Sequence, residues 1–227
     1  MPSIGVFTRA FAAITGTEFG SIMKLQRVLR DAGLLTTGAR GVNAPDMVPL
    51  DAARMLIAVL VTDKPSLAPL AVSEFGRLPA GDRIMSEVPT PEGAVFSGLT
   101  DSMSLEETLA GVIEGTAAAP LEHHKLLSRN LKLSCNPTDL TADLSWCDGR
   151  SRFSAGGPWM MLLMDPEANA QRLDEIAAEQ EDARIRARVF AGYGSRIKTV
   201  REVDGDLLME VADLFRRAER GETRMAG

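Results

Sequence analysis

The chain has 227 residues, of which 45% are apolar and 25% charged, as in a globular protein that buries a core in one large domain or two small ones. The net charge of −6 argues against a protein that coats nucleic acid with its whole surface. The longest apolar run, Met55–Val61, is far shorter than the roughly 20 residues of a membrane span. The start of the chain lacks the basic residues and long apolar stretch of a secretory signal, and two cysteines make no disulfide framework. We therefore expect a cytoplasmic protein.

The charge is distributed unevenly along the chain. Residues 1–62 carry six basic and four acidic side chains, a net charge of +2, which leaves −8 for the remainder. Local potential, and not the total charge, steers an anionic partner toward a surface. The distribution therefore permits a nucleic-acid surface at the N-terminal end.

Two amphipathic helices are predicted at the start of the chain. Residues 6–14 have apolar side chains at helical spacing and are followed by Gly16, a typical stop. Thr17 can cap the second helix, which ends at Gly33. Its predicted apolar stripe consists of Ile22, Leu25, Val28, Leu29 and Ala32. Its opposite side is mostly basic and carries Ser21, Lys24, Arg27 and Arg30.

A loop and a third helix follow. The loop has Arg40 between Gly38 and Gly41, with Thr36, Thr37 and Asn43 as further polar side chains. Pro49 and Asp51 suit the first turn of the third helix. Its inward residues are predicted to be Ala53, Leu56, Ile57 and Leu60. A fourth short helix is expected between Pro65 and Pro79.

The remainder is predicted to begin with an inter-domain linker or a long loop and to continue as a segment of helices and strands. Residues 87–104 are rich in Pro, Gly, Ser and Thr, and Ser104 with Glu107 forms a capping box before a helix. Residues 131–146 alternate apolar and polar side chains and predict a hairpin, and Trp159–Met164 is expected to be a buried strand. A surface helix from Asp165, a strand at 195–203 and an amphipathic helix at 204–221 complete the prediction.

The first 60 residues resemble the winged-helix unit of MerR-type regulators. The order of a short helix, a tight turn, a second helix ending in "AGLL", a basic loop and a helix opening "PLDAARML" carries the resemblance. The combination also resembles uncharacterised proteins of phage or gene-transfer-agent origin. By that resemblance the second helix is a recognition helix in the major groove and the loop is a wing.

The resemblance implies a set of DNA-binding residues. Lys24 and Arg27 fall where the family has basic recognition-helix residues, and Arg40 falls at the tip of the wing. Hydroxyl and amide side chains nearby can donate to phosphates. The expected set is Ser21, Lys24, Arg27, Thr36, Thr37, Arg40 and Asn43. A basic helix face beside a glycine-rich loop can also be no more than a solvated surface.

The sequence indicates neither a metal site nor an enzyme. His123, His124, Cys135 and Cys147 lack the close pairing of structural zinc ligands, because the cysteines are twelve positions apart. Cys147 beside Asp148, with a histidine upstream, is the sole candidate nucleophile set, and no nucleophile elbow accompanies it. We expect no cofactor.

These observations predict an α+β protein. Residues 1–85 are expected to form a winged helix-turn-helix domain, 86–103 a linker, and 104–227 a domain of an antiparallel sheet and helices for oligomerisation or partner binding. The predicted function is sequence-specific binding of double-stranded DNA by a homodimeric transcriptional regulator of phage-like origin. The alternatives are a phage-type DNA-packaging or assembly adaptor, and a small-molecule-sensing or hydrolytic C-terminal domain, which an apolar pocket lined by Trp146, Phe153 and Trp159 would favour.

Overall fold

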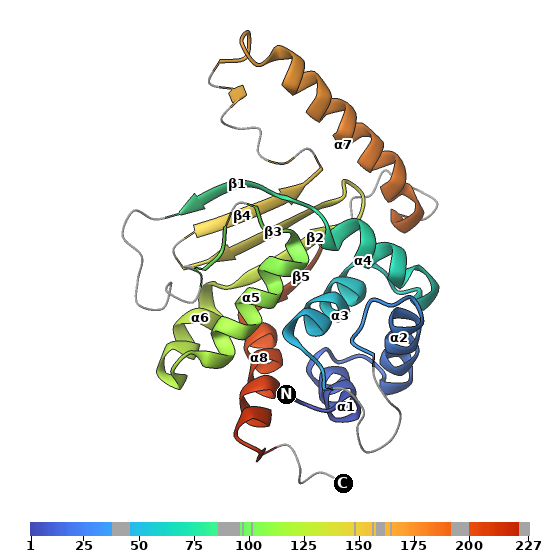
Figure 1. The fold of residues 1–227 in the computed structure, drawn as a ribbon, viewed down its shortest axis with the longest axis vertical. Helices are drawn as coiled ribbons and strands as arrows, with labels where there is room; N and C mark the ends of the chain where they lie inside the picture. Colours follow the sequence, from blue (N-terminus) through green and yellow to red (C-terminus); the bar gives the residue numbers. More distant parts are fainter. Residues whose placement is uncertain are drawn as a thin grey trace.

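The computed structural model describes residues 1–37, 46–85, 96, 98–100, 102–147, 149–155, 157, 162–163, 165–191 and 200–222. In this part of the chain, eight α-helices pack with one antiparallel sheet of five strands, which confirms the predicted α+β class (Figure 1). The helices are α1 (Ile4–Ile14), α2 (Phe19–Asp31), α3 (Pro49–Val61), α4 (Ala68–Gly76), α5 (Leu105–Ala118), α6 (His124–Asn130), α7 (Ala170–Ala191) and α8 (Gly205–Glu219). The strands are β1 (Ala80–Met85), β2 (Lys132–Asn136), β3 (Thr141–Trp146), β4 (Gly149–Ser154) and β5 (Arg201–Asp204).

The sheet is built around the predicted hairpin. Strands β2 and β3 pair from Lys132 opposite Ser145 to Asn136 opposite Thr141, and β4 continues the meander after a short turn. The strand order is β1-β4-β3-β2-β5, so the two outer strands come from distant parts of the chain. Strand β1, which the sequence did not predict, pairs with β4, because neighbours far along the chain supply its hydrogen bonds.

Alternation along the strands gives the sheet two different faces. The buried face carries Leu133, Cys135, Ala142, Leu144, Trp146 and Phe153. The other face carries polar residues such as Lys132, Asp143 and Arg152, which are exposed. Helices α3, α5, α6 and α8 lie together on one side in Figure 1, and α3 and α6 contact the strands directly.

Helix α3 is the centre of the molecule. Nine of its thirteen residues are buried, because it packs against α4, α5 and the sheet. Arg201 of β5 forms a two-pronged ion pair with Asp63, just after α3, with N–O distances of 2.8 and 2.5 Å. One hydrophobic core extends from Phe7 of α1 to Phe215 of α8. The division into domains 1–85 and 104–227 stays a prediction, and this packing gives it no support.

The predicted linker contains core residues. Phe96 is fully buried and stacks on Trp146 with a centroid separation of 5.0 Å, and Leu99 is also buried. The assignment of 86–103 as a linker stays a prediction, and these two apolar side chains within the stretch rich in Pro and Gly lie in the core. Its end is as predicted: the Glu107 amide and carboxylate form a reciprocal cap with Ser104.

Most helix boundaries follow the sequence signals. Gly16 and Gly33, which end α1 and α2, have φ angles of +62° and +72°, a region that glycine adopts without strain. The third, fourth, seventh and eighth helices form close to where they were expected. The expected buried strand Trp159–Met164 is not formed by its two described residues. Leu162 and Leu163 lie in a 3₁₀ turn, and Leu163 is 49% exposed. The other four residues of that stretch are outside the described residues.

Candidate nucleic-acid interface

Helix α2 presents one buried side and one exposed side. Ile22, Leu25 and Leu29 are buried against the core, as their spacing predicts. Two details differ from the predicted stripe: Gln26 is buried at 7% exposure, whereas Ala32 lies exposed beyond the last turn. The helix is therefore held by three large aliphatic side chains, and the opposite side faces solvent.

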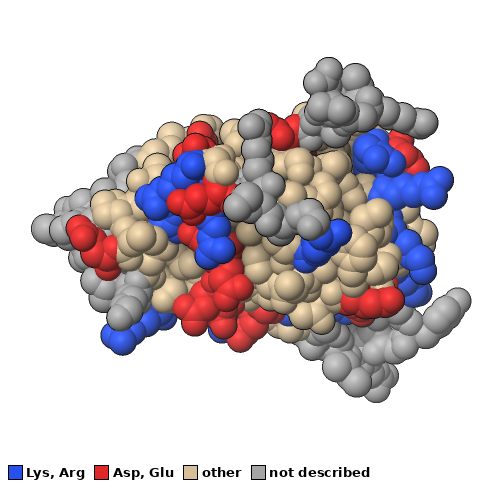
Figure 2. Space-filling model, turned by 90° about the horizontal axis from the view of Figure 1, so that it is seen from below, with Lys and Arg blue, Asp and Glu red and all other residues tan. Residues whose placement is uncertain are grey.

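The exposed side of α2 carries three basic residues. Lys24, Arg27 and Arg30 are all exposed. Arg27 lies 3.8 Å from Asp31, one turn later, and both side chains are more than 60% exposed, so this pair contributes little to stability. Figure 2 shows Lys and Arg side chains along the right-hand edge, on the side where α2 lies in Figure 1, with a few acidic side chains among them. The Arg27 guanidinium can therefore change partners at low cost.

Two exposed apolar residues share this side of the helix. Phe19 is 45% exposed and Met23 is 44% exposed, and they lie one turn apart. Phe19 and Met23 are not among the residues expected from the sequence to bind DNA, although a helical projection places both outside the stripe of Ile22, Leu25 and Leu29. A large apolar side chain outside the buried stripe of a helix is the sequence signal that could have identified these two exposed residues.

Ser21 lies on the flank of α2. Its side chain is half-buried, its hydroxyl lies 3.2 Å from the Glu18 carboxylate, and it lines a cavity of about 270 Å³. The residues that line this cavity from beyond α2 include Val59, Thr62 and Pro65, at and after the end of α3. Ser21 thus faces away from the direction of Arg27, which lies about 120° further round the helix at 100° per residue.

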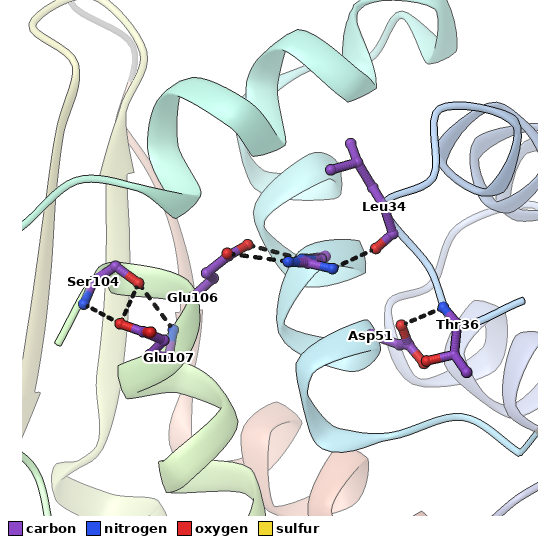
Figure 3. Close-up of polar contacts among 7 residues, drawn as sticks. Leu34, Thr36, Asp51, Ser104, Glu106 and Glu107 are labelled. Carbon is purple, nitrogen blue, oxygen red and sulfur yellow. Dashed lines mark hydrogen bonds and ion pairs between the residues drawn. The ribbon is translucent and has the colours of Figure 1, made fainter.

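The candidate residues after α2 are partly outside the described chain. Thr37 is exposed, and Thr36 is half-buried with its amide donating to Asp51 Oδ1 at 2.9 Å. Arg40 and Asn43 lie in residues 38–45, outside the described residues. Asp51 also accepts a hydrogen bond from the Val48 amide at 3.0 Å. This one buried carboxylate therefore fixes the chain on both sides of the predicted wing, and Figure 3 shows its contact with Thr36.

A second contact fixes the exit from α2. Arg54 of α3 binds both carboxylate oxygens of Glu106 on α5, at 2.8 and 3.1 Å, and donates to the Leu34 carbonyl at 2.9 Å (Figure 3). The hydrogen bonds that Arg54 donates to Glu106 raise the pKa of Arg54. Gly76 allows this arrangement, because a Cβ there would come within 2.8 Å of Glu106 Oε2. The segment after α2 is thus bound to the centre of the fold.

The residues of the rejected zinc site are placed in different surroundings. The His124 ring lies 3.2 and 3.4 Å from the two terminal nitrogens of Arg216, and Arg216 binds Asp213. Burial and the charge of Arg216 lower the pKa of His124. The side chain of His123 and all of Asp148 are outside the described residues. Among the side chains that are described, no group of three or more His, Cys, Asp or Glu could hold a metal ion.

Cys135 and Cys147 are thiols that form no disulfide. Cys135 is fully buried in β2, and burial followed by the charge of Asp143 raises its pKa to about 12. A thiol held protonated in this way is a poor nucleophile. Of the predicted aromatic pocket, Trp146 and Phe153 are buried core residues, and Trp159 is outside the described chain.

Comparison with known proteins gives no relative: no family model, no curated protein and no solved structure matches the chain. Within the described ranges, no helix combines the length and the apolar character needed to cross a bilayer.

Proposed function

We propose that the protein binds double-stranded DNA in a sequence-specific manner, as a transcriptional regulator does, with the exposed side of α2 as the contact surface. The observation that carries the proposal is the exposed row of Lys24, Arg27 and Arg30 on a helix whose other side is fixed by Ile22, Leu25 and Leu29. A helix anchored in this way can enter the major groove without unfolding any part of the core.

Each exposed side chain has a chemical role in this proposal. Arg27 lies near the centre of the exposed side, so its guanidinium is the candidate for a two-pronged contact to a guanine edge. Lys24 and Arg30 lie to either side of it and neutralise phosphates. The side chains of Phe19 and Met23 are suited to the apolar C5-methyl group of thymine. Residues 34–36 and 46–48, fixed through Arg54 and Asp51, hold the ends of the loop that contains Arg40.

The test is a salt titration of DNA binding by the full chain. A preferred duplex is first selected from a random pool, and binding to it and to an unselected duplex is measured by fluorescence anisotropy between low and physiological salt. The proposal expects binding that weakens with salt and is tighter for the selected duplex.

A matched pair of triple variants locates the surface. Lys24, Arg27 and Arg30 are changed to alanine in one, and Lys132, Arg150 and Arg152, exposed on the outer face of the sheet, in the other. Both variants lose three positive charges. The α2 variant should lose binding and the sheet variant should retain most of it. An equal loss of DNA affinity in both variants would show that binding depends on net charge alone and not on α2. Absence of DNA binding by the parent protein would refute the proposal.

A further inference from the structure

Helix α7 has a second, exposed side that the rest of the described chain does not cover. Its inner side is buried at Ile176, Ala183 and Ala187. Near its C-terminal end it is fixed to α4 through an ion pair between Arg186 and Glu74 at 2.8 Å. Figure 1 shows the rest of the helix extending away from the body. The outer side therefore points away from the core to which the inner side is attached.

The outer side carries an apolar seam. Ile185 is 52% exposed and Val189 is 45% exposed, although both are large aliphatic residues in a helix with many charges. Ala178 and Asp182, also exposed, continue the row toward the N-terminus. The spacing 178, 182, 185 and 189 alternates four and three residues, which is the spacing of the two inward positions of a coiled coil.

The charges beside the seam are arranged in opposite pairs. Glu181 and Arg188 are seven residues apart and lie on one flank, and Glu179 and Arg186 lie seven apart on the other. In each pair the acidic residue is nearer the N-terminus. A helix with this arrangement is complementary to a copy of itself that runs in the opposite direction.

We propose that two copies of this chain associate through an antiparallel pair of α7 helices. With Ala178 opposite Val189 of the second copy and Asp182 opposite Ile185 of the second copy, Glu181 lies beside Arg188 of the second copy. On the other flank, Arg186 already binds Glu74 and Asp182 of its own chain. The two-fold axis repeats each contact, so the seam has four layers and two flanking ion pairs. This inference is independent of the DNA-binding proposal.

The same pattern favours the antiparallel pair over a parallel one. In a parallel pair, each flank of one helix contacts the opposite flank of the second copy. Glu181 would then meet Arg186 of the second copy, and Glu179 would meet no basic residue of that helix. The second copy would cover Ile185 and Val189, and the Asp182 carboxylate beside them binds Arg186 within its own helix. A seam of four layers is short, so association should depend on concentration.

The test uses charge reversal at one flank. Glu181 pairs only weakly with Arg184, at 3.5 Å with both side chains more than half exposed, so replacing it costs little stability. The variants Glu181→Arg and Arg188→Glu do not alter the ion pair between Arg186 and Glu74 that holds α7 to α4. Each single variant places like charges together in its own dimer. A one-to-one mixture of the two, and the double variant, both restore opposite charges.

Mass in solution is measured by sedimentation velocity over a range of protein concentrations. The parent should show twice the chain mass at high concentration, and each single variant should need roughly tenfold more protein to reach it. The mixture and the double variant should return to the parent value. Ile185→Ser should also weaken association, whereas Leu70→Ser, at a 41% exposed residue of α4, should not. A monomeric parent, or a dimer that is indifferent to all these changes, would overturn the proposal.

Discussion

Arg54 and Glu106 form a two-pronged ion pair between α3 and α5, and the third contact of the same guanidinium is the Leu34 carbonyl at the exit from α2. Both side chains are mostly shielded, with 21% and 16% of their surfaces exposed. The pair joins segments that are 52 residues apart and sets the position of the chain that leaves the candidate interface. The ion pair therefore holds the backbone at Leu34, next to the C-terminal end of α2.

Removing this pair should destabilise the fold. Arg54→Ala leaves a shielded Glu106 carboxylate without its cation and frees the Leu34 carbonyl, so we expect a loss of about 3 kcal/mol in the free energy of unfolding. Urea denaturation followed by circular dichroism measures it. Arg27→Ala, which removes an exposed pair of the same chemical type, is the control and should change the value by less than about 0.5 kcal/mol. Equal effects would show that the shielding of Arg54 is unimportant.

Arg27→Ala should instead affect DNA binding. Loss of a two-pronged base contact should cost about 1–3 kcal/mol on the selected duplex and reduce the preference over an unselected duplex. The comparison is the ratio of the two affinities at one salt concentration. A variant with unchanged affinity and unchanged preference would exclude Arg27 as a base contact.

Arg40→Ala should give a different result, on the sequence-based expectation that Arg40 contacts a phosphate. Affinity for the selected and the unselected duplex should fall together, and the slope of log affinity against log salt should decrease by about one unit. A change in preference without a change in slope would contradict the phosphate contact.

Residues 1–85 should not fold as an isolated fragment. Helix α3 is buried on nearly all sides by α4, α5 and the sheet, and β1 has its hydrogen-bond partners in β4. The fragment would expose that surface to water, so its circular dichroism should show reduced helicity and no cooperative thermal transition. A cooperative transition like that of the full chain would support the two-domain interpretation.

Stability should decrease as the pH falls below about 6.5, the ordinary pKa of histidine. Burial of His124, with Arg216 beside it, lowers its pKa in the fold, whereas Asp213 and the carbonyls of Thr116 and Ala119 act in the opposite direction. The unfolded chain then binds the proton first, so protons favour unfolding between the unfolded and the folded pKa. Urea midpoints at pH 7.5 and 5.5 measure this. The difference should shrink in His124→Gln and persist in His123→Gln.

The sequence by itself predicted the elements whose signals are local. Pro49 and Asp51 at the start of α3, the cap of Ser104 and Glu107, and the glycines after α1 and α2 act within one helical turn, and all of them form as expected. The hairpin of β2 and β3 follows from period-two alternation over adjacent segments. These signals depend on neighbours in the chain, so one sequence suffices to detect them.

Tertiary structure alone decided the features that depend on distant partners. The segment Ala80–Met85 becomes a strand because β4 is beside it, and Phe96 becomes a core residue because Trp146 offers a ring to stack on. The basic side of α2 and the position of Phe19 and Met23 outside its apolar stripe follow from the spacing, but the exposed fraction of these two side chains depends on where the core ends. Burial and pairing across long stretches of chain are properties of packing, and no local pattern encodes which distant surface a segment will meet.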